Sequence, residues 1–151
     1  MKLALALVAL TLAAAETKPD FSGTWKQNSS RSNFAGQAVP ISVTDIITHK
    51  EPDLHLTQTV VGPQGDSTTS EHDFFTDGRE SAGKSRNYTE KNTVKWEGNS
   101  LVFVTRRDYA GREVALRERW TLSADGKTLM KERVSPGRNG EVKQTFVLEK
   151  Q

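Results

Sequence analysis

The sequence of 151 residues contains no cysteine, so it has no disulfide, no thiol nucleophile and no thiol to carry a lipid anchor. It also lacks an excess of charge of one sign, because 21 Lys and Arg stand against 19 Asp and Glu. The two signs alternate along the chain, and nucleic-acid binding would need a one-sided basic face. Burial and hydrogen bonds alone must therefore hold the fold, and we expect no nucleic-acid partner.

Long hydrophobic runs are absent except at the start of the chain. There Lys2 precedes an apolar run from Leu3 to Leu12, and small residues follow up to Ala15. Ten apolar residues are too few to span a bilayer, which needs about 20 in a helix. We interpret residues 1–15 as a cleaved signal peptide and 16–20 as a short linker. The mature protein is then expected to be periplasmic or secreted, with no membrane anchor.

Signatures of common enzymes are also missing. The chain has no Gly-x-Ser-x-Gly elbow, no glycine-rich phosphate loop and no His-Glu-x-x-His motif. We therefore predict that the protein is not an enzyme and needs no cofactor, while catalysis on a bound hydrophobic compound stays a third hypothesis.

What the sequence does contain is a succession of short β-type segments separated by turn signals such as Asp77-Gly78, Asp125-Gly126 and 136–140. Asp-Gly between alternating residues is a strong hairpin signal, because glycine adopts the positive φ that a tight hairpin turn needs. Space for a helical turn exists only at 29–36. The expected strands are 22–28, 42–49, 54–61, 67–76, 85–95, 100–109, 113–123, 127–134 and 141–149. We predict an all-β domain over 21–151, an antiparallel up-and-down meander closed into a barrel of about 8–10 strands, with a sandwich as the alternative.

Alternation assigns the two faces of each strand. Val114, Glu118 and Trp120 share one face, which we expect to point inward. Other inward rows also include polar residues: Gln58, Thr105, Arg107 and Gln144. Unpaired polar groups in a solid core are costly, so these residues favour a cavity that holds water or a ligand. Alternatively, they lie near the open rims of the barrel. The basic pairs 106–107, 117/119 and 131/133 are interpreted as solvated strand faces.

The segment Phe21-Ser22-Gly23-Thr24-Trp25-Lys26 resembles the first strand of the calycins, which include lipocalins, fatty-acid-binding proteins and, more distantly, avidins. This resemblance implies a closed β-barrel in which Trp25 is a structural plug at one end. Gly23 would allow neighbouring backbone to come close. Hairpins at 95–98 and 125–129 also resemble those of uncharacterised secreted bacterial proteins.

The resemblance also shows differences from fatty-acid-binding proteins. Their last strand carries an Arg-x-Tyr pair that holds a carboxylate, whereas Phe146 and Leu148 occupy the matching positions here. The segment 29–36 is too short for the helical pair that caps those barrels. In lipocalins an arginine near the last strand packs over the tryptophan, and Lys150 is the comparable cation here.

A metal site is a weak hypothesis. A tight turn at 51–53 would place His49 opposite His55, and two imidazoles could then reach one metal ion. Solvated histidines explain the same pattern, and we assign no metal.

For a ligand pocket, the candidate residues are those expected to point inward with aromatic or polar side chains. They are Gln58, Phe74, Tyr88, Trp96, Phe103, Glu118, Trp120 and Phe146. Such a wall suits a small, mainly apolar or weakly cationic ligand. The alternative is a filled barrel that acts through its outer surface as an interaction or inhibitor module. The sequence does not identify a protein partner.

Overall fold

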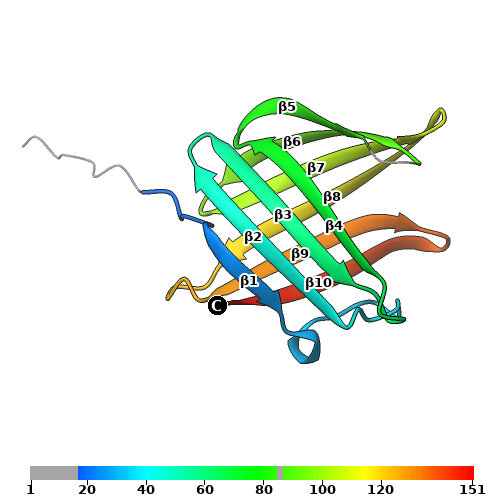
Figure 1. The fold of residues 1–151 in the computed structure, drawn as a ribbon. Coiled ribbons are helices and arrows are strands. Elements are labelled where there is room, and N and C mark those ends of the chain that lie inside the picture. The colour runs from blue at the N-terminus through cyan, green and yellow to red at the C-terminus, as the bar shows by residue number, and fades with distance from the viewer. Residues whose placement is uncertain (1–16, 85–86) are drawn as a thin grey trace, which may run out of the picture.

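The protein is described by a computed structural model that covers residues 17–84 and 87–151 (Figure 1). The described chain is a ten-stranded antiparallel sheet with one turn of 3-10 helix, η1 (Ser29–Arg31). The strands are β1 (Gly23–Gln27), β2 (Ser42–Lys50), β3 (Asp53–Val61), β4 (Ser67–Phe75), β5 (Asp77–Lys84), β6 (Thr89–Glu97), β7 (Ser100–Tyr109), β8 (Arg112–Leu122), β9 (Thr128–Gly137) and β10 (Gly140–Lys150). The predicted all-β meander is therefore confirmed.

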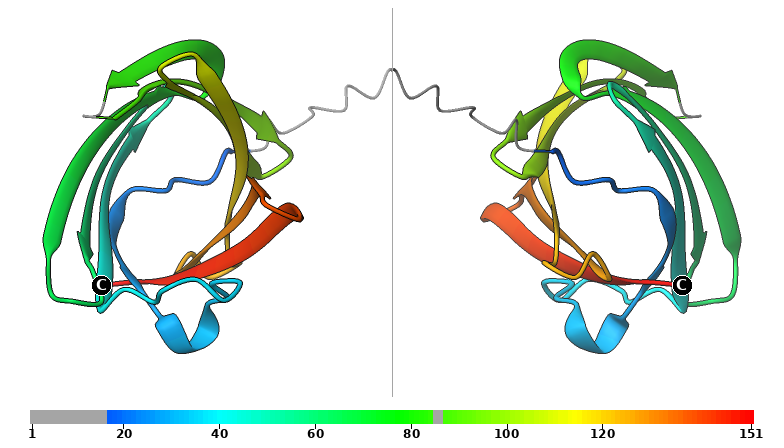
Figure 2. Two further views of the ribbon diagram at one scale, coloured as in Figure 1. Left: turned by 90° about the vertical axis from the view of Figure 1, so that its right-hand side faces the viewer. Right: turned by 90° about the vertical axis from the view of Figure 1, so that its left-hand side faces the viewer.

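The sheet curls until the first and last strands pair (Figure 2). Trp25 of β1 lies opposite Lys150 of β10, and the order around the barrel is β4-β3-β2-β1-β10-β9-β8-β7-β6-β5. β4 and β5 end this order, and no ladder joins them within the described residues. The barrel is nearly closed, which excludes two stacked sheets.

The base of the barrel is built around Trp25, which is fully buried. Its indole Nε1 donates a hydrogen bond to the carbonyl oxygen of Phe21 at 2.9 Å. Lys150 Nζ lies 5.3 Å from the centre of the Trp25 ring, so a lysine takes the place of the lipocalin arginine. Gly23 has a φ of +143°, and a Cβ there would lie 2.7 Å from Lys150 Cε. Glycine at this position thus permits both the backbone conformation and the approach of Lys150.

The structure corrects one part of the predicted strand pattern. Asp77-Gly78 was expected to be a turn, followed by one strand over 85–95. Instead, both residues belong to the strand β5. The register of the pairing between β5 and β6 shifts between Asp77 and Glu80. Gly78 lies within this irregularity and has a φ of +87°. A bulge uses the same glycine conformation as a turn, so the sequence signal is ambiguous. The next strand, β6, begins at Thr89.

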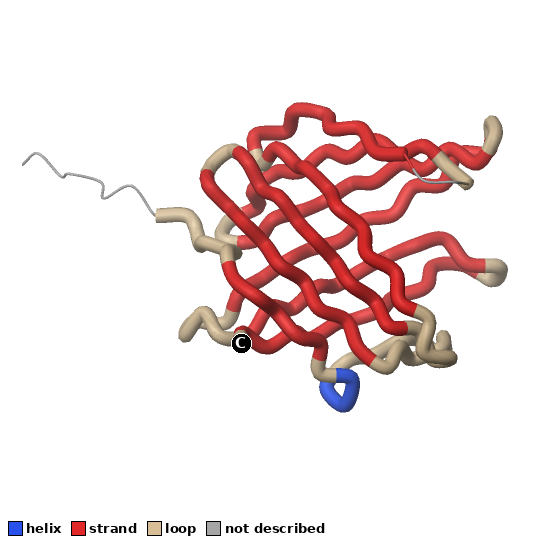
Figure 3. Tube along the Cα trace, in the orientation of Figure 1, coloured by secondary structure: helices blue, strands red, loops and turns tan. Residues whose placement is uncertain are grey.

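A second correction concerns residues 136–140. The sequence there was expected to form a turn after a strand ending at residue 134, yet β9 continues to Gly137 and only residues 138–139 connect it to β10. β8 and β9 pair from Leu122/Leu129 as far as Arg117/Val134, and beyond that point the two strands separate (Figure 3). The wall of the barrel therefore has a lateral split next to Pro136.

The N-terminal predictions are only partly covered. Residues 1–15, interpreted as a signal peptide, lie outside the described residues. Within 17–20, Lys18 Nζ donates a hydrogen bond to the carbonyl oxygen of Gly98 at 3.0 Å. Among the described residues, no helix has the length and apolar character needed to cross a membrane.

Candidate functional site

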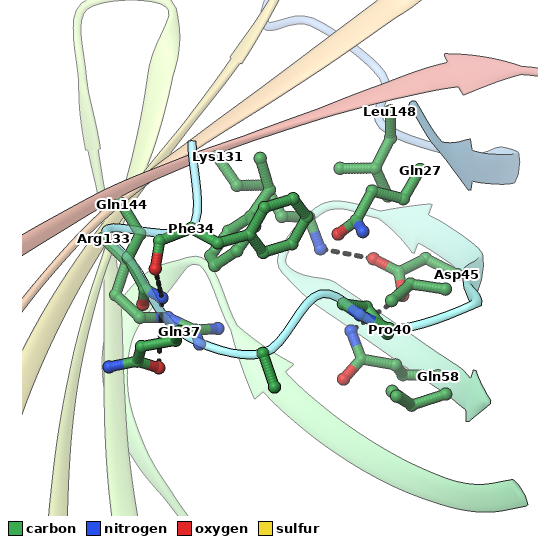
Figure 4. A pocket seen from close by; sticks show the side chains of 14 residues that line it. Gln27, Phe34, Gln37, Pro40, Asp45, Gln58, Lys131, Arg133, Gln144 and Leu148 are labelled. Atoms are coloured by element: carbon green, nitrogen blue, oxygen red, sulfur yellow. Dashed lines mark hydrogen bonds and ion pairs between the residues drawn. The ribbon is translucent and has the colours of Figure 1, made fainter. Parts of the chain in front are cut away.

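A cavity of about 220 Å³ lies inside the barrel at the end covered by residues 34–40, which we call the mouth, and Figure 4 shows the side chains that line it. Side chains of β1, β2, β3, β9 and β10 form its walls, and the segment 34–40 between η1 and β2 covers it. Seven apolar and seven polar residues line it: Phe34, Ala38, Pro40, Val43, Val60, Phe146 and Leu148, and Gln27, Gln37, Asp45, Gln58, Lys131, Arg133 and Gln144. The cavity is thus amphipathic.

A buried ion pair crosses this cavity. Lys131 Nζ of β9 lies 2.5 Å from Asp45 Oδ2 of β2, and Figure 4 shows the two side chains pointing toward each other. Gln58 Nε2 donates a second hydrogen bond to Asp45 Oδ1 at 2.8 Å, and Lys131 Nζ lies 3.7 Å from the centre of the Trp120 ring. Since a buried charge is tolerated only when it is paired, these contacts hold both charged groups in place.

Glu118 and Arg133 form the second charged pair of the interior. Glu118 accepts hydrogen bonds from Arg133 Nε and from Trp120 Nε1, each at 2.6 Å. Burial raises the pKa of Glu118, but the charges of Arg133 and Lys131 outweigh this effect and hold the pKa below its ordinary value. The carboxylate of Glu118 is therefore ionised and already neutralised, so it is not a free partner for a cationic ligand.

A smaller hollow of about 90 Å³ adjoins the main cavity and shares Gln58, Lys131 and Arg133 with it. Its polar centre is Glu90, which lies 3.2 Å from His72 Nδ1 and 3.2 Å from Arg107 Nε. The hydrogen bond from His72 is the main reason that the pKa of Glu90 falls to about 2. Each of the three interior carboxylates at positions 45, 90 and 118 is thus paired with a cationic or imidazole side chain.

The segment over the mouth is held by specific contacts with β10. The Phe34 ring meets the Phe146 ring edge-on at 5.8 Å between centres. Gln144 Nε2 donates hydrogen bonds to the Phe34 carbonyl oxygen at 3.1 Å and to Gln37 Oε1 at 3.3 Å. Asn33 forms a bridge with Thr145. Between β1 and β2 the chain forms only the single turn η1, in agreement with the prediction that 29–36 is too short for a helical pair, and the residues that follow cover the cavity.

One donor in the cavity has no protein partner. Gln27 Nε2 is buried and makes no hydrogen bond, and Figure 4 shows its amide beside Lys131 and Asp45. A buried donor without a partner costs about 1–3 kcal/mol, so a ligand oxygen at this position would remove a penalty. Gln27 is accordingly a candidate contact for the polar part of a ligand.

Six of the eight predicted pocket residues line the two hollows: Gln58, Phe74, Phe103, Glu118, Trp120 and Phe146. Trp96 lies instead at the base, where its ring is 6.0 Å from that of Phe21 and Nε1 donates to Glu51. Tyr88 precedes β6 and contacts Tyr109 at 5.2 Å between ring centres. The structure therefore brings most of the candidates together and places two elsewhere.

The sequence interpretation of 131/133 as a solvated face is wrong. Lys131 is buried and Arg133 half-buried, both inside the barrel, and Arg107 is half-buried against Glu90. The alternation of β9 did not indicate which face points inward, because both faces carry apolar and charged residues. Met130 and Val134 lie on the outer face, opposite to Lys131 and Arg133. Asp45 was not among the predicted pocket residues, because a charged residue in a strand is usually interpreted as solvated. Its position on the same face as Val43 and Ile47 could have indicated that it points inward.

The metal hypothesis for His49 and His55 rested on a different register. His49 pairs with Leu54 and His55 with Thr48, so the two imidazoles lie on opposite faces of the hairpin. The His49 side chain is buried and bonds Glu51 at 2.7 Å, whereas the His55 side chain lies outside and bonds Asp73 at 2.7 Å. No cluster of three His, Cys, Asp or Glu able to hold a metal occurs among the described residues.

No family model matches the sequence, and no curated protein is significantly similar to it. Solved structures do match. Secretory abundant heat soluble protein 4 from Ramazzottius varieornatus superimposes with a TM-score of 0.65 at 16% identity, over 91% of this chain and 99% of that one. A further secretory abundant heat soluble protein of this organism gives a TM-score of 0.62 at 14% identity, over 89% of this chain and 98% of that one.

Zebrafish ileal bile acid-binding protein, solved with cholic acid, also matches, with a TM-score of 0.58 at 17% identity over 87% of this chain and 98% of that one. At these identities the likeness concerns the fold alone. The paired first and last strands, the buried Trp25 at the base and these structural matches together show that the chain adopts a calycin-like β-barrel.

Proposed function

We propose that this is an exported, non-enzymatic protein that binds a small, mainly apolar molecule with a polar end inside its barrel. The observation that carries the proposal is the cavity of about 220 Å³ under residues 34–40, together with the adjoining hollow of about 90 Å³. Ligand pockets typically measure about 300–1,000 Å³ and combine an apolar wall with a few fixed polar groups. The leader at 1–15 supports export to the periplasm or the medium.

The lining supports an amphipathic ligand. Phe34, Val43 and Phe146 supply apolar surface, and the cavity also holds two polar groups, the unpartnered amide of Gln27 and the guanidinium of Arg133, which lies 5.0 Å from the centre of the Phe146 ring. Only Nε of Arg133 is used by Glu118, so its remaining N–H groups are available to a ligand oxygen. Because the interior carboxylates are already paired, we favour a neutral or anionic polar end over a cationic one.

The comparisons support binding in the interior. Ileal bile acid-binding protein was solved in complex with cholic acid, a rigid apolar skeleton with hydroxyl groups and a carboxylate, and it shares this fold. A ligand of similar chemistry fits the mixed lining described above. The sequence-level hypothesis of an enzyme receives no support from this comparison.

The test fills the cavity from one position and uses the next residue as control. Val60 of β3 lines the cavity, whereas Val61 follows it on the outer face of the same strand. We expect the wild type to enhance the fluorescence of the amphipathic anion 1-anilinonaphthalene-8-sulfonate. Val60→Trp should weaken this binding at least about tenfold, and Val61→Trp by less than about twofold.

Equal binding by both variants would place the dye outside the barrel and contradict the proposal. Absence of any dye response, together with no co-purified mass in native mass spectrometry of protein from its own host, would favour the alternative of a surface module. Circular dichroism of both variants checks that the barrel is intact.

A further inference from the structure

Lys131 differs in its surroundings from the other lysines that the structure describes. Its side chain is buried, points into the barrel from β9 and lines both the main cavity and the adjoining hollow. The other described lysines are exposed: Lys18, Lys26, Lys50, Lys84, Lys91, Lys95, Lys127, Lys143 and Lys150. Among the described residues, the interior therefore offers a ligand one primary amine, and that amine belongs to Lys131.

Stability alone does not require this lysine. In a buried ion pair such as Lys131/Asp45, the loss of hydration offsets most of the attraction, and an apolar pair of similar size often stabilises a fold as well or better. What the pair does provide is position. Lys131 Nζ lies 2.5 Å from Asp45 Oδ2 and 3.7 Å from the centre of the Trp120 ring. The nitrogen is thus held at a defined point of the cavity wall.

We propose that Lys131 forms an imine with a small aldehyde that has an apolar body, so that the ligand is held covalently in the cavity. The inference rests on the proposed function and names the reactive group of its ligand. An aldehyde is a neutral polar end, which suits an interior whose carboxylates are already paired. The apolar surface of Phe34, Val43 and Phe146 receives the body of the ligand.

The neighbours of Lys131 supply the groups that imine formation needs. An amine attacks a carbonyl carbon only after it has lost a proton, and Asp45 Oδ2 is placed to accept that proton from Nζ. The lone pair of Nζ then adds to the carbonyl carbon, and a proton moves from the nitrogen to the oxygen, which gives a carbinolamine. Asp45 donates its proton to this hydroxyl group, water leaves, and the C=N bond forms. In total, one ammonium and one aldehyde become one protonated imine and one water.

The reaction preserves the charge balance of the interior. The protonated imine carries the positive charge that the ammonium carried, so Asp45 stays paired, and Gln58 Nε2 continues to hold its Oδ1 at 2.8 Å. Gln27 Nε2, the buried donor without a protein partner, lies beside the Lys131/Asp45 contact in Figure 4. It is placed to donate to the carbonyl oxygen as negative charge develops there. No buried charge is left without a partner at the end of the reaction.

The first test measures labelling of each lysine in the full protein. The probe is 3-phenylpropanal with sodium cyanoborohydride, which reduces an imine to a stable secondary amine that peptide mass spectrometry locates. Lys91 of β6 is the matched control in the same molecule, because it also faces a carboxylate, that of Glu80 at 3.4 Å, but is exposed. We expect the initial rate at Lys131 to exceed that at Lys91 at least about tenfold, since the cavity holds the carbonyl group next to Nζ.

The second test compares the aldehyde with 3-phenylpropan-1-ol, which has the same body but no carbonyl group. In the wild type, the aldehyde should displace 1-anilinonaphthalene-8-sulfonate at a concentration at least about tenfold lower than the alcohol. The double variant Asp45→Asn/Lys131→Met removes both charges together and so leaves neither unpaired; in it the two compounds should displace the dye equally. Lys91→Met is the control and should keep the preference for the aldehyde. Circular dichroism checks the fold of both variants, and the labelling test in the wild type does not depend on them.

Equal labelling of Lys131 and Lys91, or equal displacement by aldehyde and alcohol in the wild type, would overturn the imine. A preference for the aldehyde that persists in the double variant would place the reaction at another residue and overturn the role of Lys131. In each case the proposed function would still stand if the alcohol displaced the dye, and it would fail too if neither compound did.

Discussion

The two ends of the barrel interior are built from different materials. At the base, four fully buried apolar side chains pack together: Phe21, Trp25, Leu101 and Leu129. None of these four residues lines either of the two interior hollows. Toward the mouth, charged pairs such as Asp45/Lys131 surround open volume. The base gains stability from burial of apolar surface, whereas the mouth needs paired charges to remain folded. Stability and binding are thus assigned to different ends of one barrel.

This separation explains why the mouth tolerates so many ionisable groups. A buried ion pair contributes little net stability, because desolvation offsets the attraction, but it fixes the positions of the groups that it joins. Asp45 and Lys131 tie β2 to β9 across the interior, and Glu118 orients Arg133. The polar side of the cavity is therefore rigid before any ligand arrives, which lowers the cost of binding.

Trp25→Ala should have the largest effect on stability. Truncation of a fully buried aromatic side chain typically costs about 3–5 kcal/mol of stability. Trp25 has no exposed surface, so its removal would leave a buried cavity. Urea denaturation measures this loss. Because the base does not line the cavity, dye affinity per folded molecule should change less than about twofold in buffer without urea. A large loss of affinity at full folding would show that the two ends are coupled.

Glu90→Gln should show an intermediate effect with a pH dependence that Trp25→Ala lacks. The pKa of Glu90 is lowered to about 2, chiefly by His72, so the folded protein favours the ionised form more than the unfolded chain does. This contributes roughly 3 kcal/mol at neutral pH, and the contribution is lost as the pH falls from about 4.5 to about 2.

The measurement is the free energy of unfolding of both proteins between pH 7 and pH 2. The difference between wild type and Glu90→Gln should be largest near neutral pH and shrink across the acidic window. Glu80→Gln, at an exposed position on β5 whose carboxylate meets Lys91 at 3.4 Å, is the matched control and should shift stability by less than about 0.5 kcal/mol. A constant difference across this pH range would contradict the assignment.

Sequence patterns predicted the base better than the mouth, for a physical reason. Gly23, Trp25 and the alternating apolar residues of β3 encode burial directly, since their periodicity follows the pleat. Lys131 and Asp45 are charged residues inside the barrel. From the alternation of a strand alone, such residues are interpreted as solvated unless their partners are known. Those partners are far apart in sequence, so only the three-dimensional structure reveals them.

The split between β8 and β9 shows a related limit. Pro136-Gly137 was expected in a turn because both residues are common there, and the dipeptide does lie immediately before the connection at 138–139. Whether proline ends a strand or only its pairing on one side depends on the register with β8, which no local pattern contains. The Asp77-Gly78 signal failed for a different reason, because a bulge and a turn use the same glycine conformation and a local pattern does not distinguish them.

Gln144→Met should have the smallest effect on stability and a selective effect at the mouth. The substitution removes two hydrogen bonds to residues 34 and 37 while keeping a side chain of similar size, so the expected loss is about 1 kcal/mol. Thr121→Ala on β8 is the control, since it removes a hydrogen bond of 2.8 Å to Ser100 on the outer surface. We expect both variants to unfold at similar urea concentrations.

Only Gln144→Met should accelerate hydrogen exchange of the Gln37 amide, which bonds the Phe34 carbonyl oxygen at 3.1 Å, and only this variant should release bound dye faster. Stability would then be nearly equal in two variants that differ in ligand release, so that control of access at the mouth would be separable from the stability of the barrel. Equal release rates would mean that the segment 34–40 covers the cavity without controlling access to it. The difference between the two ends would in that case lie in their lining alone.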